Sequence, residues 1–281
     1  MRDVFYRGST GNEIHFNRHP YYLNRATDLL SHKWGYTNNE YVDRIESFSM
    51  RFAERKFDLG IIEPSDVAYG KALQDLNIIF DYDVITRSHG RLYVGDDYLR
   101  CYVIENSQST YDTRANKVLR PYKLIAEDGR WIREKIYSTI PDMPDGTDKG
   151  IDYPYDYPYD YAYDVRWGSV KNDTVSGADF VMTIYGACTM PGVYIGEQEY
   201  YVNIEIDLGE KLVIDSIAKT LLLYHVDGTV ENVFSRRGRE SDIFAQIPSG
   251  EFSISRNDNF DVRLQLFEYR SEPEWWKIES I

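Results

Sequence analysis

The chain has 281 residues, 42% of them hydrophobic, and a formal net charge of −14 at pH 7. It is long enough to bury a substantial core in one to three domains, and its acidity disfavours capture of nucleic acid, because an acidic surface releases no counterions from a phosphate backbone. No run approaches the ~18 apolar residues that span a bilayer and the first residues lack a signal-peptide core, so we expect a soluble, unsecreted protein with no membrane contact.

Most of the first half alternates apolar and polar residues with period two, which is typical of β-strands. Residues 45–57 predict one strand with Phe48, Met50 and Phe52 on the same face. Residues 90–105 predict a hairpin that turns at residues 95–97. Residues 117–140 predict a second hairpin that turns at Asp128 and Gly129, because Asp-Gly supplies the positive φ of a type I′ turn.

One segment departs from this pattern and predicts an amphipathic helix over residues 66–84. Either Ser65 or Asp66 is expected to accept hydrogen bonds from the free N–H groups of its first turn. Gly70 inside the helix costs about 1 kcal/mol relative to alanine, which indicates a close approach by another group or simple tolerance. Apolar residues recur at spacings of three and four, and core packing is their default explanation: Val67, Tyr69, Ala72, Leu73, Leu76, Ile79, Phe80 and Val84.

Residues 142–164 form an Asp/Tyr/Pro-rich tract with seven aspartates and one lysine in 23 residues. Pro154 and Pro158 exclude a central strand, so the tract is an edge strand or a polyproline-like spacer. We interpret it as a linker between two domains. Its tyrosines are also interface candidates, because tyrosine is enriched in interface cores; in an extended chain they share one face, and the candidates are Tyr153, Tyr155, Tyr157, Tyr159 and Tyr161.

The second half alternates short strands with tight turns, which predicts a β-sandwich over residues 165–281. Turns are expected at Asp227 and Gly228 and at residues 257–259, each joining two strands into a hairpin. The expected strands are residues 180–185, 199–207, 211–215, 220–226, 229–234, 251–255 and 260–269.

The chain lacks the usual signatures of catalysis and metal binding. Cys101 and Cys188 have no metal or redox spacing, so buried free thiols are expected. The five histidines are scattered, and the aspartates of residues 142–164 lack the spacing of a calcium loop. No phosphate-binding loop, zinc-protease motif or nucleophile elbow is present. We therefore expect no enzymatic activity, no cofactor and no metal site.

Two local features leave alternatives open. Arg236, Arg237 and Arg239 indicate a solvated or subunit-contacting turn in preference to a nucleic-acid patch. Trp275 and Trp276 are carbohydrate-stacking candidates by residue type, although tryptophan is more often buried. A carbohydrate-binding protein acting through the C-terminal sandwich is the alternative function, and a glycoside hydrolase with two acidic residues is a weaker one.

Several segments resemble the distal tail protein of long-tailed phages that infect Gram-positive bacteria, and the resemblance depends on their order and spacing along the chain. In the first half they are residues 71–80, KALQDLNIIF, and residues 90–103, GRLYVGDDYLRCYV. In the second half they are IYGACT at 184–189, LVIDS at 212–216, NVFSRR at 232–237, IPSG at 247–250 and LQLFEYRSEP at 264–273. Residues 1–44 match poorly.

The resemblance implies a mainly β fold in two domains: an N-terminal β-barrel or sandwich with one α-helix over residues 1–141, and a galectin-like β-sandwich over residues 165–281. It also implies a structural virion protein of the tail tip, made in the host cytoplasm. Such a protein forms a ring, usually of six copies, that joins the tail tube protein to the tail-tip hub and docks receptor-binding proteins.

The ring implied by the resemblance surrounds a channel through which DNA passes without specific binding. The helix and the N-terminal hairpins are candidates for the contact between copies, with Tyr69, Leu73 and Leu76 as candidate residues on the helix. The helix can equally face its own core.

Overall fold

The computed structural model describes residues 3–25, 28–39, 44–107, 110–112, 117–139, 165–166, 168–240 and 242–274. The chain divides into two compact units. Unit 1 comprises Met1–Ile132 and Arg270–Ile281, and unit 2 comprises Arg133–Tyr269. Strands β11 and β23 each carry the chain from one unit into the other. The domain bounds expected at residues 141 and 165 stay a prediction.

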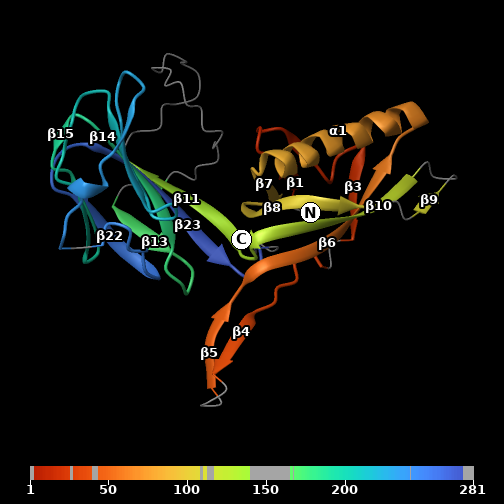
Figure 1. Ribbon diagram of the computed structural model, residues 1–281, viewed down its shortest axis with the longest axis horizontal. Helices are drawn as coiled ribbons and strands as arrows, with labels where there is room; N and C mark the ends of the chain where they lie inside the picture. Colours follow the sequence, from red (N-terminus) through yellow and green to blue (C-terminus); the bar gives the residue numbers. More distant parts are fainter. Residues whose placement is uncertain are drawn as a thin grey trace, which may run out of the picture. The chain divides into compact units, whose positions relative to one another are not determined.

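Unit 1 is built mainly from antiparallel strands and one helix (Figure 1). Strands β2, β1, β7 and β8 pair in that order, and β3, β6, β10 and β9 pair in a second set that β8 joins through β10. The elements are β1 (Val4–Arg7), β2 (Glu13–His15), β3 (Tyr21–Arg25), β4 (Gly35–Asn39), β5 (Arg44–Ser49), β6 (Arg51–Ile62), α1 (Asp66–Thr86), β7 (Gly90–Val94), β8 (Asp97–Asn106), β9 (Thr110–Asp112), β10 (Lys117–Asp128) and the start of β11 (Trp131–Ser138).

The predicted helix is confirmed as α1, and the Ser65 side chain accepts a hydrogen bond from the Ala68 N–H at 3.3 Å. Its inner face buries Leu76 and Phe80 in the core of unit 1. The Phe80 ring packs edge-on against Tyr6 and Tyr122, with ring centroids 5.0 and 5.7 Å away. Aromatic pairs at these distances add to the burial of apolar area, so α1 is fixed to both sets of strands.

The segment predicted as one strand over residues 45–57 forms two strands, and the shared face predicted for Phe48, Met50 and Phe52 is wrong, because the chain bends there. β5 ends at Ser49, β6 begins at Arg51, and Phe52 has a φ of 38°. Met50 is buried, whereas Phe48 and Phe52 are exposed, so the three do not share a face. A bulky residue with positive φ is strained and is held by its surroundings. The bend separates a hairpin of β4 and β5 from the body of unit 1.

The hairpin predicted at residues 90–105 is confirmed as β7 and β8, which turn at Gly95 with a φ of 64°. The second predicted hairpin is wrong: in the described residues β10 pairs with β6, β8 and β9 and not with β11. The Asp128 side chain instead accepts a hydrogen bond from the Arg130 N–H at 3.2 Å. This local turn lets the chain leave one set of strands without pairing back on itself.

Unit 2 is a β-sandwich, as the sequence predicts, and its two sheets enclose one core. One sheet has the order β23-β14-β19-β20-β21 and the other β13-β22-β16-β17. Its elements are the rest of β11, then β12 (Val165–Arg166), β13 (Ser169–Asn172), β14 (Asp179–Tyr185), β15 (Cys188–Thr189), β16 (Gly192–Ile195), β17 (Gln198–Tyr201), β18 (Glu205–Ile206), β19 (Lys211–Asp215), β20 (Thr220–Tyr224), β21 (Val230–Asn232), the 3-10 helix η1 (Phe234–Arg236), β22 (Gly250–Arg256) and β23 (Asp261–Arg270).

Alternation along β13, β14, β19 and β20 places every second side chain in the core, as a half-buried sheet requires. In β14, for example, Phe180, Met182 and Ile184 are fully buried. The turn at Asp227 and Gly228 is confirmed between β20 and β21, and Gly228 has a φ of 85°. Residues 257–259 do not close a hairpin, because β22 and β23 belong to opposite sheets.

The fold class is therefore confirmed as mainly β with one α-helix, and the described residues form sheets without a closed barrel. The galectin-like character of the C-terminal sandwich stays a prediction. No helix in the described part of the chain is long and apolar enough to cross a membrane.

Candidate assembly surfaces

The candidate site residues fall into three groups. Tyr153, Tyr155, Tyr157, Tyr159 and Tyr161 lie outside the described residues, as do Trp275 and Trp276. Tyr69 and Leu73 are half-buried against the core of unit 1, and Leu76 is fully buried in it. The Leu76 side chain therefore stabilises its own unit and is not presented on the surface of α1.

The described residues contain no group of three or more His, Cys, Asp or Glu side chains that could hold a metal ion. Both cysteines are buried and free, as the sequence predicts. Burial raises the pKa of the Cys101 thiol to about 12 and that of Cys188 to about 11. Neither thiol is activated as a nucleophile, because the thiolate is the reactive form.

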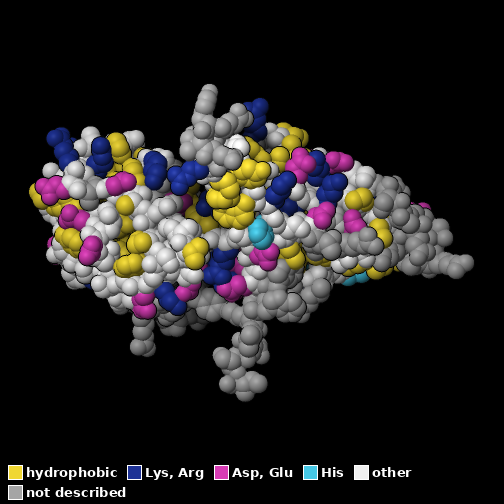
Figure 2. Space-filling model, turned by 90° about the horizontal axis from the view of Figure 1, so that it is seen from below, with side chains coloured by type: hydrophobic (Ala, Val, Ile, Leu, Met, Phe, Trp, Pro, Cys, Tyr) yellow, Lys and Arg dark blue, Asp and Glu magenta, His cyan; other side chains and the backbone are white. Residues whose placement is uncertain are grey.

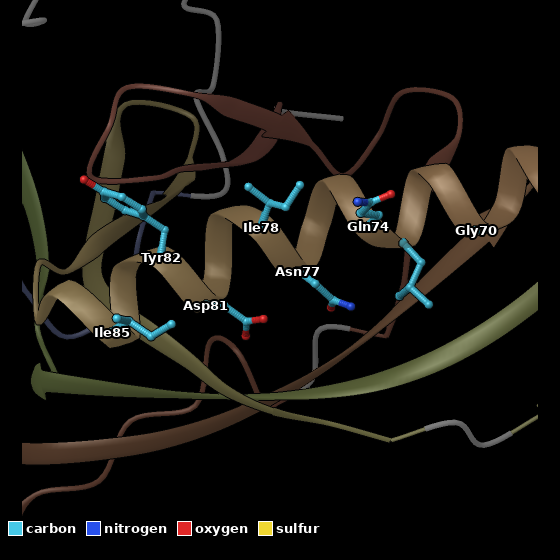
Figure 3. A pocket seen from close by; sticks show the side chains of 8 residues that line it. Gly70, Gln74, Asn77, Ile78, Asp81, Tyr82 and Ile85 are labelled. Carbon is cyan, nitrogen blue, oxygen red and sulfur yellow. The ribbon is translucent and has the colours of Figure 1, made fainter.

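The outer face of α1 carries a shallow groove of about 560 Å³ (Figure 3). It lies between two rows of side chains, each with a spacing of four residues, which is the ordinary groove between ridges on a helix surface. Three of its apolar lining residues, Ile78, Tyr82 and Ile85, are exposed to solvent. We call this surface the α1 groove; its two rows are Gly70, Gln74, Ile78 and Tyr82, and Leu73, Asn77, Asp81 and Ile85.

The hairpin of β4 and β5 is the second unpartnered apolar surface of unit 1, and we call it the arm. Tyr36 is directly opposite Phe48 across the two strands, and their side chains are 68% and 61% exposed. Trp34, two residues before Tyr36, is 48% exposed. In Figure 1 the arm projects from the end of β6, and Figure 2 shows hydrophobic side chains on the side toward which it points.

The base of the arm is fixed to unit 1 by Arg55 on β6, which is only 2% exposed. Its guanidinium donates hydrogen bonds to the carbonyl oxygens of Leu29 at 2.7 Å and Gly129 at 2.5 Å and lies 5.5 Å from the centre of the Trp131 ring. Burial lowers the pKa of Arg55, because desolvation disfavours the charged form. The arm therefore extends from an ordered base.

Unit 2 presents charged and aromatic groups on its surface. Arg237 lies over the Phe234 ring at 3.9 Å, and Phe234 stacks on Phe244 with ring centroids 5.9 Å apart. This exposed turn contains the arginines that the sequence analysis singled out. A guanidinium stacked on an aromatic ring is held in place by a cation–π contact, so the turn presents positive charge in a defined position.

A histidine lies between two carboxylates elsewhere on unit 2. The His225 Nδ1 atom lies 2.5 Å from Oε1 of Glu210, and its Nε2 atom lies 3.6 Å from Oε2 of Glu231. The hydrogen bond to Glu210 raises the pKa of His225 above its ordinary value, and the same bond lowers the pKa of Glu210. This arrangement ties the β20–β21 hairpin to the turn before β19.

Of the α1 groove, sequence reasoning found Leu73 and missed the exposed apolar residues, and it missed the arm. Ile78, Tyr82 and Ile85 lie outside the apolar stripe predicted for the helix. The signal that could have found them is that α1 carries apolar residues on more than one face, which is unusual for a helix with a solvated side. For the arm, the signal is the recurrence of aromatic residues at Trp34, Tyr36 and Phe48.

No family model and no curated protein sequence matches the chain. Solved structures do match. The Dit protein of phage SPP1, described as a paradigm of the hub adsorption apparatus in phages that infect Gram-positive bacteria, has a TM-score of 0.59 at 10% identity, over 96% of this chain and 99% of that one.

A chain of the phage P2 baseplate in its activated conformation with calcium has a TM-score of 0.59 at 12% identity, over 97% of this chain and 100% of that one. A chain of the same baseplate with strontium has a TM-score of 0.58 at 12% identity, with the same coverage of both chains. At these identities the comparisons establish a shared fold, and they confirm at that level the resemblance found in the sequence.

Proposed function

We propose that the chain is a structural, non-enzymatic protein of a phage tail tip, located in the virion and made in the host cytoplasm. The observation that carries this proposal is the extent of the fold likeness to the SPP1 Dit protein, which takes in nearly the whole of both chains. A likeness confined to one sandwich would carry little weight, because such folds serve many functions. Here the likeness covers 96% of this chain and 99% of that one, so it is not confined to one unit.

In this role, six copies form a ring that joins the tail tube protein to the tail-tip hub, and the C-terminal sandwiches give docking sites for receptor-binding proteins. A ring closes through heterologous contacts, so each copy needs two different surfaces that fit one another. Unit 1 supports this requirement with two separate unpartnered apolar surfaces, the arm and the α1 groove.

The charge of the chain fits passage of DNA through the ring without specific binding. Each copy carries a net charge of −14. A channel wall of the same sign as the phosphate backbone repels it, and no counterion release favours adhesion.

Light scattering after size exclusion, at several protein concentrations, tests the proposed assembly. A species near six times 32.9 kDa, seen as closed rings by negative-stain electron microscopy, is the expected result. A chain that remains a monomer at every concentration would overturn self-assembly into a ring.

A further inference from the structure

We propose that the aromatic face of the arm of one copy docks into the α1 groove of a second copy, and that this contact joins neighbouring copies. The inference rests on the proposed ring and identifies the residues that close it. It follows from the chemistry of the two surfaces and from their places in unit 1.

The arm has two chemically different faces. Tyr36 and Phe48 are cross-strand partners on one face. Thr37 and Ser47 are the next pair along the strands, and their hydroxyl oxygens lie 2.7 Å apart on the other face. Because side chains alternate along a strand, one face is aromatic and the other is polar. A two-stranded hairpin is at best marginally stable alone in water, so the aromatic face needs a partner.

The α1 groove is suited to receive such a ridge. The Ile78 and Tyr82 side chains form one wall, and Ile85 lies in the opposite row (Figure 3). At one end of the groove, a Cβ atom placed on Gly70 would have no atom within 4 Å, so the fold of unit 1 does not require glycine there. Glycine in a helix costs about 1 kcal/mol relative to alanine. A close approach by the docked arm explains why this residue is present.

The occupant is a second copy because unit 1 carries both halves of the contact. Of the twelve large hydrophobic side chains exposed in its described residues, five lie on the arm or its base and five on α1. In Figure 1, α1 runs along one side of unit 1 and the arm points away on the other, so the arm does not reach the groove of its own copy. Two complementary surfaces on different sides of a molecule give a head-to-tail contact, which closes into a ring when the rotation between neighbouring copies divides a full turn.

The area involved is adequate for such a contact. An aromatic side chain buries roughly 150–250 Å² when fully covered. Covering the exposed parts of Trp34, Tyr36, Phe48 and Phe52 therefore supplies several hundred Å², a large share of the roughly 800 Å² per partner in a standard interface. The remaining area is available from the backbones of the two strands.

Variants on opposite faces of the same element test the contact in the full-length protein. On the arm, Tyr36→Ser with Phe48→Ser is compared with Thr37→Ala with Ser47→Ala. On α1, Ile78→Glu is compared with Val67→Glu, an exposed apolar residue outside the groove. The first variant of each pair should raise the protein concentration at half-dissociation by at least about tenfold, as expected for a central interface residue. The second should leave it unchanged.

Cross-linking provides an independent measurement. A chain with Phe48→Cys and Ile78→Cys, treated with a bismaleimide, should give a ladder of covalent oligomers on a denaturing gel. The chains with only one of these substitutions should give mainly monomer. The native thiols, Cys101 and Cys188, are buried and do not compete.

The outcomes separate this contact from the ring itself. A ring that persists in both arm variants and in Ile78→Glu, with no cross-linked ladder, would overturn the docking of the arm and leave the ring in place. A wild-type chain that remains monomeric at every concentration would overturn both. A ring whose stability depends on Tyr36, Phe48 and Ile78, and not on their matched controls, supports the contact.

Discussion

The Lys135 ammonium lies 2.5 Å from Oε1 of Glu268, a carboxylate with no exposed surface in unit 2. The same oxygen accepts a hydrogen bond from the Asp173 N–H at 2.7 Å. Lys135 also contacts the Asp173 carboxylate at 2.8 Å. Removing one partner of a buried pair leaves an uncompensated charge in a medium that solvates it poorly. The stability of unit 2 should therefore depend strongly on Lys135.

Lys135→Met should lower the free energy of unfolding by about 3–5 kcal/mol, the cost of breaking a buried ion pair from one side. The matched control is Lys171→Met, because Lys171 is an exposed partner of the same Asp173. Exposed pairs contribute about 0–1 kcal/mol. Urea unfolding of the two variants provides the measurement, and equal effects would contradict the role of the buried pair.

The carboxyl of Asp173 gives a pH dependence of known sign. Hydrogen bonds from Lys135 and then from Lys171 lower its pKa to about 2, from an ordinary value of 3.8. A carboxyl whose pKa is lowered by folding stabilises the folded state at pH values above its ordinary pKa. This stabilisation is lost as the pH falls toward 2. Between pH 4 and pH 2, wild type should therefore lose more stability than Asp173→Asn. Parallel curves of unfolding midpoint against pH would contradict this.

The His225–Glu210 pair should lose its stabilising effect as the pH rises, the opposite of the dependence expected for Asp173. The pKa of His225 is raised above 6.5, mainly by its hydrogen bond to Glu210. Its contribution to stability is complete below pH 6.5 and is lost as the pH rises through the raised pKa. Thermal unfolding at pH 5.5 and pH 8.5 should show a larger loss for wild type than for His225→Gln. An equal loss in both would show that the pair contributes nothing.

Replacement by alanine should change the stability of unit 1 in opposite directions at Gly90 and at Gly70. A Cβ on Gly90 would lie 2.1 Å from the Tyr6 hydroxyl and 2.6 Å from Oδ2 of Asp83, which themselves share a hydrogen bond of 2.7 Å. Gly90→Ala should therefore destabilise unit 1 by roughly 1–3 kcal/mol, as overpacking does. Gly70→Ala, in open space on α1, should stabilise it by about 1 kcal/mol. Chemical denaturation of the dissociated chain measures both, and a destabilising Gly70→Ala would mean that unit 1 itself needs this glycine.

The two cysteine thiols should not react with thiol reagents in the folded chain. Cys101 and Cys188 are buried, and their pKa values are raised to about 12 and 11. At pH 8 neither has an appreciable thiolate fraction, so a disulfide reagent should react with both only after unfolding in urea. Rapid labelling of one thiol under native conditions would show that its surroundings open readily.

The sequence by itself determined the class of each element where the hydrophobic period was clear. Helix α1 follows from apolar spacings of three and four, and the sequence narrows its cap to Ser65 or Asp66, of which the structure shows Ser65. The strands β14, β19 and β20 follow from strict alternation, because one face of a sandwich sheet must be apolar. The fold resemblance came from the order of several such segments.

Only the tertiary structure decided which strands pair and which apolar residues remain uncovered. A period-two pattern shows which residues of a strand lie on the same face, but it does not show which strand is the neighbour. The Asp128-Gly129 turn therefore predicted a β10–β11 hairpin that the described residues do not form. Leu76 and Ile78 are likewise both apolar residues of one helix, yet Leu76 is fully buried and Ile78 is 57% exposed. Burial depends on contacts between residues distant in the chain, and these exist only once the fold has formed.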